Sequence, residues 1–416
     1  MMLGGMGRTA RTQRDARTSS KGTAIELCAG LGGIGLGLRE IGFDVRHAYD
    51  AWSTAVDVYN DNEAGMRAKT CDLLSNDGRR IIAADLRKLG GVDLLAAGPP
   101  CKGFSQIKNG RHDGRRAENR THNRVLKSIP SYVALVRPRF VLVENVPALE
   151  THRDGKTLRE LLAGLSNPAR NLKYTVSYQV YDAAHFGTPQ SRRRLLVLAV
   201  RRGENEIELP LPGTDMRQLF TAVRLGHPVP KVMREFATSL ADPTTIAPTT
   251  VDQALSDLPV HEAGNLADVA AYASSPKTEF QRRMRIGAGT SVTGMRTPAV
   301  KDETLDRLRH IPPGGCILDV PAKSRGDLAR SYHSAYRRLH PDAPSTALST
   351  KYDCVYHYSL PRSLSLREYA RLQGIPDSFQ FTSELVARRA AYEMIGNSVP
   401  PQLIAGVLAK TFEAGT

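Results

Sequence analysis

A glycine-rich segment near the start of the chain has the residue types of a cofactor-binding loop. Residues 30–35 are Gly-Leu-Gly-Gly-Ile-Gly, directly after an apolar run and before a helical pattern, and Asp50 ends the next apolar run. Glycines let the backbone turn tightly and approach a ligand, and an acid at that place can accept hydrogen bonds from ribose hydroxyls. The pattern predicts a nucleoside-containing cofactor, and it fits a nicotinamide dinucleotide as well as S-adenosylmethionine.

A cysteine in a rigid setting is the second candidate. Cys101 stands in the segment GPPCKGFS (98–105), directly after the apolar run VDLLAAG (92–98). In an open parallel sheet the carboxyl ends of the strands line the ligand crevice, so we expect Cys101 beside the glycine loop. A nearby cation would lower the thiol pKa from its ordinary value of about 8.5 toward the nucleophilic thiolate. A lone cysteine can also be an inert small hydrophobe, but the flanking prolines and glycine favour the reactive interpretation.

A glutamate and two arginines complete the set of reactive types. Glu144 lies near the end of the apolar run FVLVENV (140–146). A carboxylate is unfavourable there unless it is paired, so we expect Glu144 either to act in acid-base chemistry or hydrogen bonding, or to cap the next turn. Arg192 and Arg194 precede the apolar run 194–200, and alternate strand positions face the same way. Two guanidiniums on one side could bind phosphate or a base carbonyl, whereas a solvated charge cluster is the alternative.

The elements that must position these residues form an α/β pattern. Short apolar runs alternate with helical segments from residue 23 to about 202, which predicts a mostly parallel sheet with helices on both faces. The expected strands are TAIELCAG (23–30), VRHAYD (45–50), 92–98, 140–146, YTVSYQVY (174–181) and 194–200, with a helix near 124–136.

The rest of the chain is less regular. Residues 1–22 are predicted to be a flexible basic arm, and a Pro/Thr-rich region reaches to about residue 361, which predicts a loop-rich second domain. Helical patterns return at 365–374, where Gly374 and Pro376 supply a stop, and at the C-terminal segment PPQLIAGVLAKTF.

Composition narrows the class of partner. The 416 residues carry a formal net charge of +15, which predicts a polyanionic partner, either nucleic acid or an anionic membrane. No apolar run is long enough to span a membrane, and no signal peptide is recognisable, so we expect a soluble cytoplasmic protein. The five cysteines include no CxxC pair, and therefore neither disulfides nor a metal site is indicated.

Taken in order, the motifs resemble those of the DNA (cytosine-5)-methyltransferases of bacterial restriction-modification systems. ELCAGLGGIGLG is similar to the cofactor loop, GPPCKGFS to the Pro-Cys loop, ENV to the glutamate motif and QSRRR to the Gln-x-Arg-x-Arg strand. PRSLSLREYARLQGIPDSFQF and IGNSVPPQL resemble the two C-terminal motifs. The resemblance covers nearly everything after residue 22, and it implies a Rossmann-like S-adenosylmethionine-dependent fold with a smaller target-recognition domain.

The resemblance also implies a domain organisation. A catalytic and cofactor-binding domain would span 23–259, the target-recognition domain 260–346, and a return to the catalytic domain 347–416. The implied partner is double-stranded DNA, together with a cognate restriction endonuclease where one exists, and the implied state is a monomer associated with the nucleoid.

The implied chemistry is methyl transfer to C5 of a flipped cytosine. Cytosine C5 is a poor nucleophile, and addition of a thiolate to C6 activates it, a role that falls to Cys101. Glu144 would protonate or hydrogen-bond N3, Arg194 would contact O2, and Arg192 would support the loop or the adduct. No residue is identified as the base that removes the C5 proton, and water can serve.

The implied cofactor contacts are more numerous. Asp50 would bind the ribose and Asp85, with Leu86 beside it, the adenine amino group; Asp72 is the rival for that role. The remaining predicted contacts are Cys28, Ala29, Gly30, Gly32, Gly33, Ala51, Pro99, Asn397 and Ser398. Cys28 stands where the family usually has an aromatic residue and Ala51 where it has a bulky apolar one, so we expect weak to moderate cofactor affinity. Lys102 replaces the usual glutamine, and its cation could favour the Cys101 thiolate or hold a phosphate.

Three other interpretations stay open. A tRNA cytosine-5 methyltransferase would use the same Pro-Cys and ENV motifs, but it is usually compact where this chain has a long stretch before Pro361. An inactive DNA-binding member of the fold would not need the cysteine, the glutamate and both arginines. A nicotinamide-dependent dehydrogenase would explain the glycine loop alone.

Overall fold

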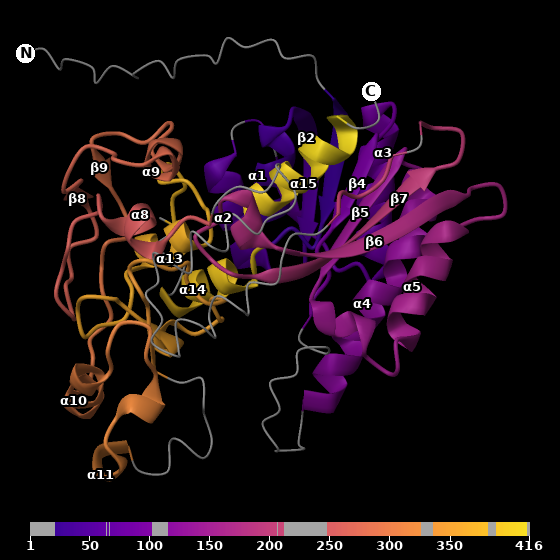
Figure 1. The fold of residues 1–416 in the computed structure, drawn as a ribbon. Coiled ribbons are helices and arrows are strands. Elements are labelled where there is room, and N and C mark those ends of the chain that lie inside the picture. Colours follow the sequence, from indigo (N-terminus) through magenta and orange to yellow (C-terminus); the bar gives the residue numbers. More distant parts are fainter. Residues whose placement is uncertain are drawn as a thin grey trace, which may run out of the picture.

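The chain is built on one sheet and a second lobe beside it. The computed structural model describes residues 21–63, 65, 67–101, 115–205, 207–211, 248–325, 336–381 and 388–413. Within them a seven-stranded sheet has the order β3-β2-β1-β4-β5-β7-β6, in which neighbours from β3 to β5 are parallel and β7 is antiparallel to β5 and β6 (Figure 1). The strands are β1 (Gly22–Leu27), β2 (Phe43–Asp50), β3 (Arg67–Thr70), β4 (Leu94–Ala97), β5 (Phe140–Asn145), β6 (Tyr174–Asp182) and β7 (Arg193–Arg201).

Helices cover both faces of this sheet because its central strands are apolar on both sides. Ala24 and Leu94 pack in one core cluster with α1 (Gly33–Glu40), α2 (Ser53–Asn62) and the C-terminal α15 (Pro401–Glu413). Their neighbours Ile25 and Leu95 pack in another with α3 (Asn76–Leu89), α4 (Arg115–Val136) and α5 (Lys156–Ser166). Continuous apolar runs are the pattern expected of parallel strands buried on both faces. The predicted fold class is therefore confirmed.

The last helix closes on the first. A Cβ at Gly37 of α1 would lie 2.5 Å from the Pro401 carbonyl and 2.8 Å from the Ile404 side chain, so only a glycine permits this close helix packing. Leu403 and Val407 of α15 are fully buried in the same core cluster as β1 and β4. Residues at the two ends of the chain therefore share one core.

The second lobe consists of short elements, as its loop-rich sequence predicts. They are α8 (Val251–Leu255), β8 (Ala270–Ala271), α9 (Glu279–Met284), β9 (Ser291–Val292), α10 (Asp302–His310), α11 (Ala322–Arg325), β10 (Arg337–Arg338), β11 (Val355–Tyr356), α13 (Leu366–Leu372) and α14 (Arg388–Asn397). The predicted helix at 365–374 is α13, capped by Ser365 and followed by Gly374 at φ 79°. Figure 1 shows these elements beside the sheet rather than on its faces.

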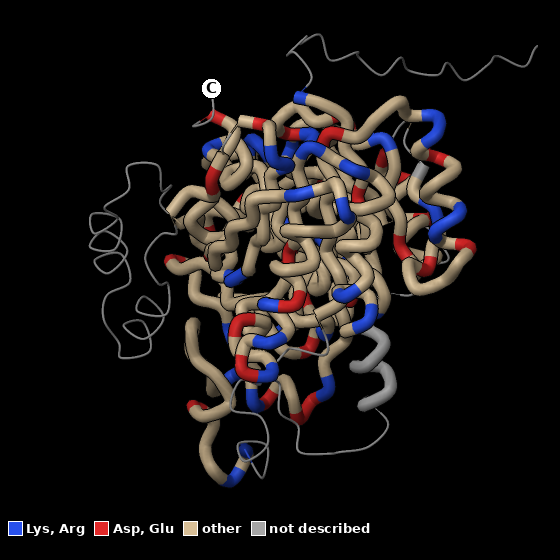
Figure 2. Tube along the Cα trace, turned by 90° about the vertical axis from the view of Figure 1, so that its right-hand side faces the viewer, with Lys and Arg blue, Asp and Glu red and all other residues tan. Residues whose placement is uncertain are grey.

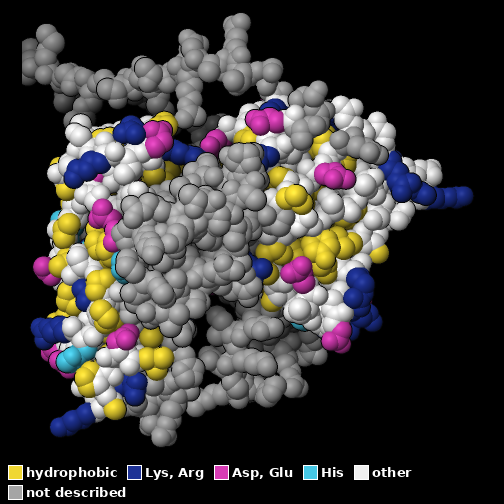
Figure 3. Space-filling view, viewed as in Figure 1, with side chains coloured by type: hydrophobic (Ala, Val, Ile, Leu, Met, Phe, Trp, Pro, Cys, Tyr) yellow, Lys and Arg dark blue, Asp and Glu magenta, His cyan; other side chains and the backbone are white. Residues whose placement is uncertain are grey.

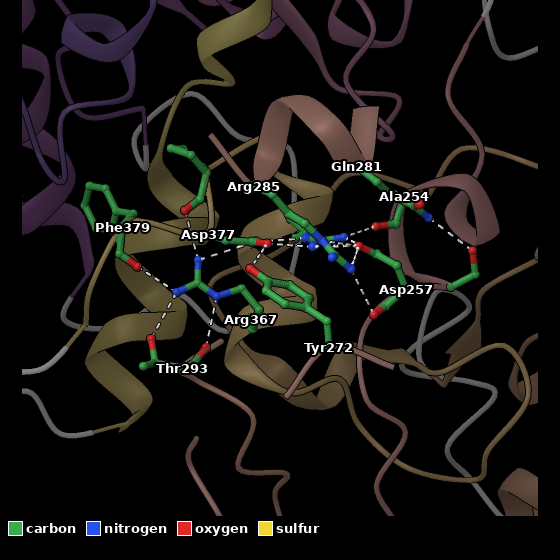
Figure 4. A network of polar contacts seen from close by, with 12 residues as sticks. Ala254, Asp257, Tyr272, Gln281, Arg285, Thr293, Arg367, Asp377 and Phe379 are labelled. Atoms are coloured by element: carbon green, nitrogen blue, oxygen red, sulfur yellow. Dashed lines mark hydrogen bonds and ion pairs between the residues drawn. The ribbon is translucent and has the colours of Figure 1, made fainter. Parts of the chain in front are cut away.

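Buried ion pairs hold the second lobe together (Figure 4). Arg371 is fully buried and its guanidinium contacts Asp257 at 2.5 Å and Asp377 at 2.6 Å. Arg285 also contacts Asp257 at 2.5 Å, and the Tyr272 hydroxyl donates to Asp377 at 2.8 Å. Because a buried charge is tolerated only when it is paired and hydrogen-bonded, this network ties α8, α9 and α13 into one unit.

Charged side chains are distributed over the described surface of both lobes. Lys and Arg alternate with Asp and Glu along the chain in Figure 2, and both signs occur on each lobe in Figure 3. Of the predicted basic arm, residues 1–22, only Lys21 and Gly22 are described, and Gly22 is already the first residue of β1. Among the described helices, none combines the length and apolar character that crossing a membrane requires.

Candidate active site

The carboxyl ends of the central strands bring most of the predicted residues to one edge of the sheet. The Gly30 backbone N–H, after β1, donates to the Asp50 carboxylate at the end of β2 across 2.8 Å. The Asn145 amide, at the end of β5, donates to the Pro99 carbonyl after β4 across 3.1 Å. A Cβ at Gly98 would lie 3.8 Å from Glu144 Oε2. The glycine loop, the Pro-Cys loop and the ENV segment are therefore neighbours.

The glycine loop leaves open space on one side and is closely packed on the other. A Cβ at Gly33 would lie 2.2 Å from the Val399 carbonyl and 2.4 Å from Ser398 Oγ. Gly32 has a φ of 91°, and a Cβ built on it would collide with the Tyr59 ring. By contrast, no atom lies within 4 Å of a Cβ built on Gly30. The open side at Gly30 is where a ligand can approach the backbone, and Ser398 closes the loop from behind. Asn397, the other predicted residue there, is exposed.

Asp50 is prepared to hold hydroxyl groups. Its Oδ2 accepts from the Gly30 N–H and its Oδ1 from the Trp52 N–H, each at 2.8 Å. Burial raises the pKa of this carboxyl, and those hydrogen bonds partly oppose the rise. Each oxygen keeps a free acceptor direction, which suits the two hydroxyls of a ribose. Ala51 beside it is exposed.

Cys28 adopts a backbone conformation that is unusual for its residue type. Its φ is 54°, in the left-handed region, directly before Ala29 and the glycines. Burial raises its thiol pKa well above the ordinary value, and the Asp50 carboxylate acts in the same direction. Both effects favour the neutral form of the thiol.

The surroundings of Asp85 and Leu86 favour a structural role over the predicted adenine contact. Both lie within helix α3, and the Asp85 carboxylate is bound by Lys69 Nζ at 2.6 and 2.7 Å and by the Tyr49 hydroxyl at 3.0 Å. Leu86 packs against the core cluster under that helix. Burial alone would raise the pKa of Asp85, but hydrogen bonds from Lys69 and Tyr49 outweigh it and lower the pKa, as expected for a structural ion pair. Asp72, the rival, follows the end of β3 and is exposed.

The strand β3 and the helix α3 were not predicted. β3 is a four-residue edge strand, Arg-Ala-Lys-Thr, that lacks an apolar run. Without it, the spacing to the Pro-Cys loop favoured Asp85 over Asp72.

Glu144 and Arg194 form a buried ion pair. Arg194 Nε lies 2.7 Å from Glu144 Oε1, and the two side chains are 12% and 9% exposed. Burial raises the pKa of Glu144, while the guanidiniums of Arg194 and then Arg192 oppose that shift. A carboxyl in this balance can hold a proton on one side while an arginine orients it from the other.

Cys101 lies beside this pair. Cys101 is half-buried, and this burial raises the pKa of its thiol. Of the neighbouring charges, Arg194 and Arg192 lower that pKa, whereas Glu144 raises it. The thiol and the ion pair are thus close enough to interact electrostatically. Lys102, predicted to act on the same thiol, lies outside the described residues.

Arg192 lies near the same groups but is bound to other segments. Its guanidinium donates to the Leu348 carbonyl at 3.0 Å and to the Gly396 carbonyl at 2.5 Å, while its Nε has no partner among the described residues. Desolvation, and then repulsion from Arg194, lower its pKa to about 9. Arg192 therefore anchors the second lobe and the C-terminal turn to the start of β7.

Sequence reasoning missed three buried polar groups around this site. Asn145 holds the Pro-Cys loop, Gln373 binds the Ser398 carbonyl at 2.6 Å, and Glu26 lies beneath the glycine loop with Tyr59 donating to it at 3.2 Å. The signal for Glu26 was a charge inside the apolar run TAIEL. Nothing local distinguishes Gln373 from an exposed helix end.

Comparison with known proteins agrees with this geometry. Residues 22–413 match the family model described as C-5 cytosine-specific DNA methylase. The chain is 29% identical to Type II methyltransferase M.AgeI of Thalassovita gelatinovora, over 94% of this chain and 98% of that protein. It is 26% identical to Type II methyltransferase M1.HphI of Haemophilus parahaemolyticus, over 95% and 87% of the two chains.

Solved structures share the fold. The chain resembles the S. pombe Dnmt2 methyltransferase with a TM-score of 0.53 and 17% identity, over 94% of this chain and 98% of that one. It resembles an Entamoeba histolytica methyltransferase, EhMeth, with a TM-score of 0.54 and 13% identity, over the same shares of the two chains.

The sheet and its glycine loop form the Rossmann-like fold that solved methyltransferase structures share. The chain belongs to the C-5 cytosine-specific DNA methylase family, whose members are DNA (cytosine-5)-methyltransferases. Membership implies use of S-adenosylmethionine and action on DNA.

Proposed function

We propose that this enzyme methylates C5 of a cytosine flipped out of duplex DNA, through a covalent bond between Cys101 Sγ and cytosine C6. The observation that carries the proposal is the Glu144 and Arg194 pair, 2.7 Å apart, next to Cys101 at the edge of the sheet that bears the glycine loop. N3 and O2 are adjacent positions on the cytosine ring, so the groups that bind them must be neighbours too.

Cys101 begins the reaction as a nucleophile. Because burial favours the neutral thiol in the free enzyme, its proton passes to water before Sγ adds to C6. Addition at C6 moves the ring electron pair to C5, and Glu144 donates a proton or hydrogen bond to N3 to stabilise the adduct. The raised pKa of Glu144 suits this donation.

Arg194 orients both partners in this step. One guanidinium edge binds Glu144, and the remaining donors can reach the cytosine O2. Arg192 acts one layer behind the base, since its two terminal guanidinium nitrogens donate to the Leu348 and Gly396 carbonyls. After methyl transfer, water removes the C5 proton and the Cys101 thiolate is released.

The cofactor fits the open side of the glycine loop. When bound, S-adenosylmethionine supplies the electrophilic methyl group. Gly30, with no atom within 4 Å of a Cβ, gives the backbone approach that its methionine part needs, and Asp50 offers two acceptors to the ribose. We assign the adenine amino group to the exposed Asp72 rather than to Asp85, and the methionine end to Asn397 and to Ser398, which packs against Gly33.

Duplex DNA is the proposed partner. Flipping a base costs a few kcal/mol, and phosphate contacts from a chain of net charge +15 offset that cost. Residues 260–346 are proposed to read the target sequence, in a monomer that acts at the nucleoid. The Type II names of the relatives suggest a restriction-modification system with a cognate endonuclease.

Trapping on a fluorinated substrate tests the proposal. Duplex DNA carrying 5-fluorocytosine at sites mapped by bisulfite sequencing should form a covalent complex with the wild-type enzyme and labelled cofactor, and none with Cys101→Ala. Labelling of tRNA in preference to DNA would favour a tRNA methyltransferase. Binding of DNA with no methyl transfer by the wild type would favour an inactive DNA-binding protein.

A further inference from the structure

Buried amide side chains connect the start of β7, the second lobe and the turn behind the glycine loop. Gln190 and Gln373 are both 0% exposed. Gln190 Nε2 donates to Gln373 Oε1 across 2.7 Å, and Gln373 Nε2 donates to the Ser398 carbonyl across 2.6 Å. Three segments that are far apart in the sequence therefore meet at the side chain of Gln373.

The two backbone ends of this chain fix its direction. The Leu348 N–H can only donate, and it donates to Gln190 Oε1 at 3.0 Å, so Gln190 must turn its NH₂ toward Gln373. Gln373 must then accept through Oε1, which leaves its NH₂ for the Ser398 carbonyl, a group that can only accept. Neither amide can rotate without losing two hydrogen bonds in a buried place.

On the second-lobe side, Gln373 is held rigidly. It caps the C-terminus of α13, whose Arg371 is paired with Asp257 and Asp377 in the buried network of Figure 4. The next residue, Gly374, has no room for a side chain, because a Cβ there would lie 1.8 Å from Gln402 Oε1. A shift of α13 is therefore passed on to residue 373.

On the other side, Ser398 is pressed against the glycine loop. If Gly33 carried a Cβ, that atom would lie 2.4 Å from the Ser398 Oγ and 2.2 Å from the carbonyl of the next residue, Val399. The turn cannot move toward the loop, and a movement away would uncover it. Gln373 holds the carbonyl of this same residue.

We propose that Gln373 is a positioning residue that couples the second lobe to the cofactor site, so that the placement of α13 sets cofactor affinity. The proposal rests on the proposed function, in which S-adenosylmethionine binds at the glycine loop. Gln373 acts through Ser398 and touches neither the cofactor nor the base. By reciprocity, a ligand that fixes the second lobe tightens cofactor binding through the same contact.

Gln373→Met tests this inference, because methionine has a similar size and lacks both hydrogen bonds. The matched control is Gln281→Met, which removes another fully buried glutamine of the second lobe whose contacts stay within that lobe. Calorimetric titration with S-adenosylhomocysteine should give a dissociation constant raised roughly tenfold for Gln373→Met and unchanged for Gln281→Met. In turnover, the cofactor KM should rise by the same factor while kcat at saturating cofactor changes much less.

Thermal melting of both variants accompanies the titration. If Gln373→Met does not fold, Gln373→Asn replaces it, since an amide one methylene shorter cannot span both contacts, and the same rise is expected. Wild-type affinity in the folded Gln373 variant, or an equal loss in Gln281→Met, would overturn the inference alone. A wild-type protein that binds no S-adenosylhomocysteine would overturn the proposed function, and this inference with it.

Discussion

Arg194 Nε and Glu144 Oε1 lie 2.7 Å apart in a place that is closed to most of the solvent. The pair joins the end of β5 to the start of β7, neighbouring antiparallel strands in the sheet. Its members stabilise each other before any base arrives, because a lone charge in this position would be strongly disfavoured. Both side chains are therefore held in place before the proposed substrate, a flipped cytosine, arrives.

Removing the arginine should make Cys101 harder to ionise. Arg194 is the strongest influence lowering the thiol pKa against burial. In Arg194→Leu we expect the alkylation of Cys101 by iodoacetamide to require a higher pH than in the wild type, and kcat/KM to fall by roughly a hundredfold or more. Peptide mapping by mass spectrometry follows each cysteine separately, so Cys316 serves as an internal reference. Identical pH profiles for Cys101 in both proteins would contradict the influence of Arg194 on the thiol pKa.

Replacing the glutamate should affect chemistry and spare the cofactor. Glu144→Gln keeps an acceptor for Arg194 but cannot deliver a proton to N3. We expect kcat to fall by roughly 10² to 10⁴, with the dissociation constant for S-adenosylhomocysteine unchanged. Single-turnover methylation and calorimetry measure the two quantities, and a loss of cofactor binding instead would place Glu144 outside the role proposed for it.

A cofactor-binding assay should distinguish the roles of Asp72 and Asp85. Asp72→Ala should weaken S-adenosylhomocysteine binding with little change in the melting temperature, because Asp72 is exposed at the end of β3. Asp85→Asn should lower the melting temperature, since it leaves Lys69 and Tyr49 poorly paired, with a smaller effect on binding. The reverse pattern would restore the original assignment of Asp85 to adenine.

Glu26 should make stability depend on pH. Burial raises its pKa from 4.5 to about 7, against the Arg39 guanidinium. Because the folded pKa is the higher one, its contribution to stability is complete below the unfolded value and is lost as pH rises through about 7. We expect this group to lower the free energy of unfolding by on the order of 3 kcal/mol between pH 4 and pH 8.

The test compares the wild type with Glu26→Gln by urea denaturation across that range. The uncharged variant should show a flatter pH dependence, with its relative gain growing between the unfolded pKa of 4.5 and the folded pKa of about 7 and levelling off above that. Parallel curves for the two proteins would mean that folding does not change the pKa of Glu26.

Much of the fold could be predicted from sequence because its signals are local. The continuous apolar runs of β1, β4, β5 and β7 and the glycine and proline after α13 identify those elements without tertiary information. The juxtaposition of Cys101 with Glu144 follows from the rule that strand ends share an edge.

The rest depends on contacts between distant residues. β3 gains its place only by pairing with β2, so its sequence carries no apolar signal and Asp72 was ranked below Asp85. Arg192 and Arg194 are equivalent in the sequence, yet one binds Glu144 and the other the Leu348 and Gly396 carbonyls. Those carbonyls belong to segments that fold back from the second lobe, which no local pattern indicates.

The packing of α15 on α1 has a consequence for biosynthesis. The sheet face that bears Ala24 and Leu94 is covered by a helix made of residues 401–413, the last of the described chain to leave the ribosome. At a synthesis rate of about 5–20 residues per second, roughly 20 to 80 seconds pass between the synthesis of β1 and that of α15. During that time apolar strands are open to other nascent chains, so yield in the cell should depend on chaperones, and a premature stop before α15 should leave no folded catalytic core.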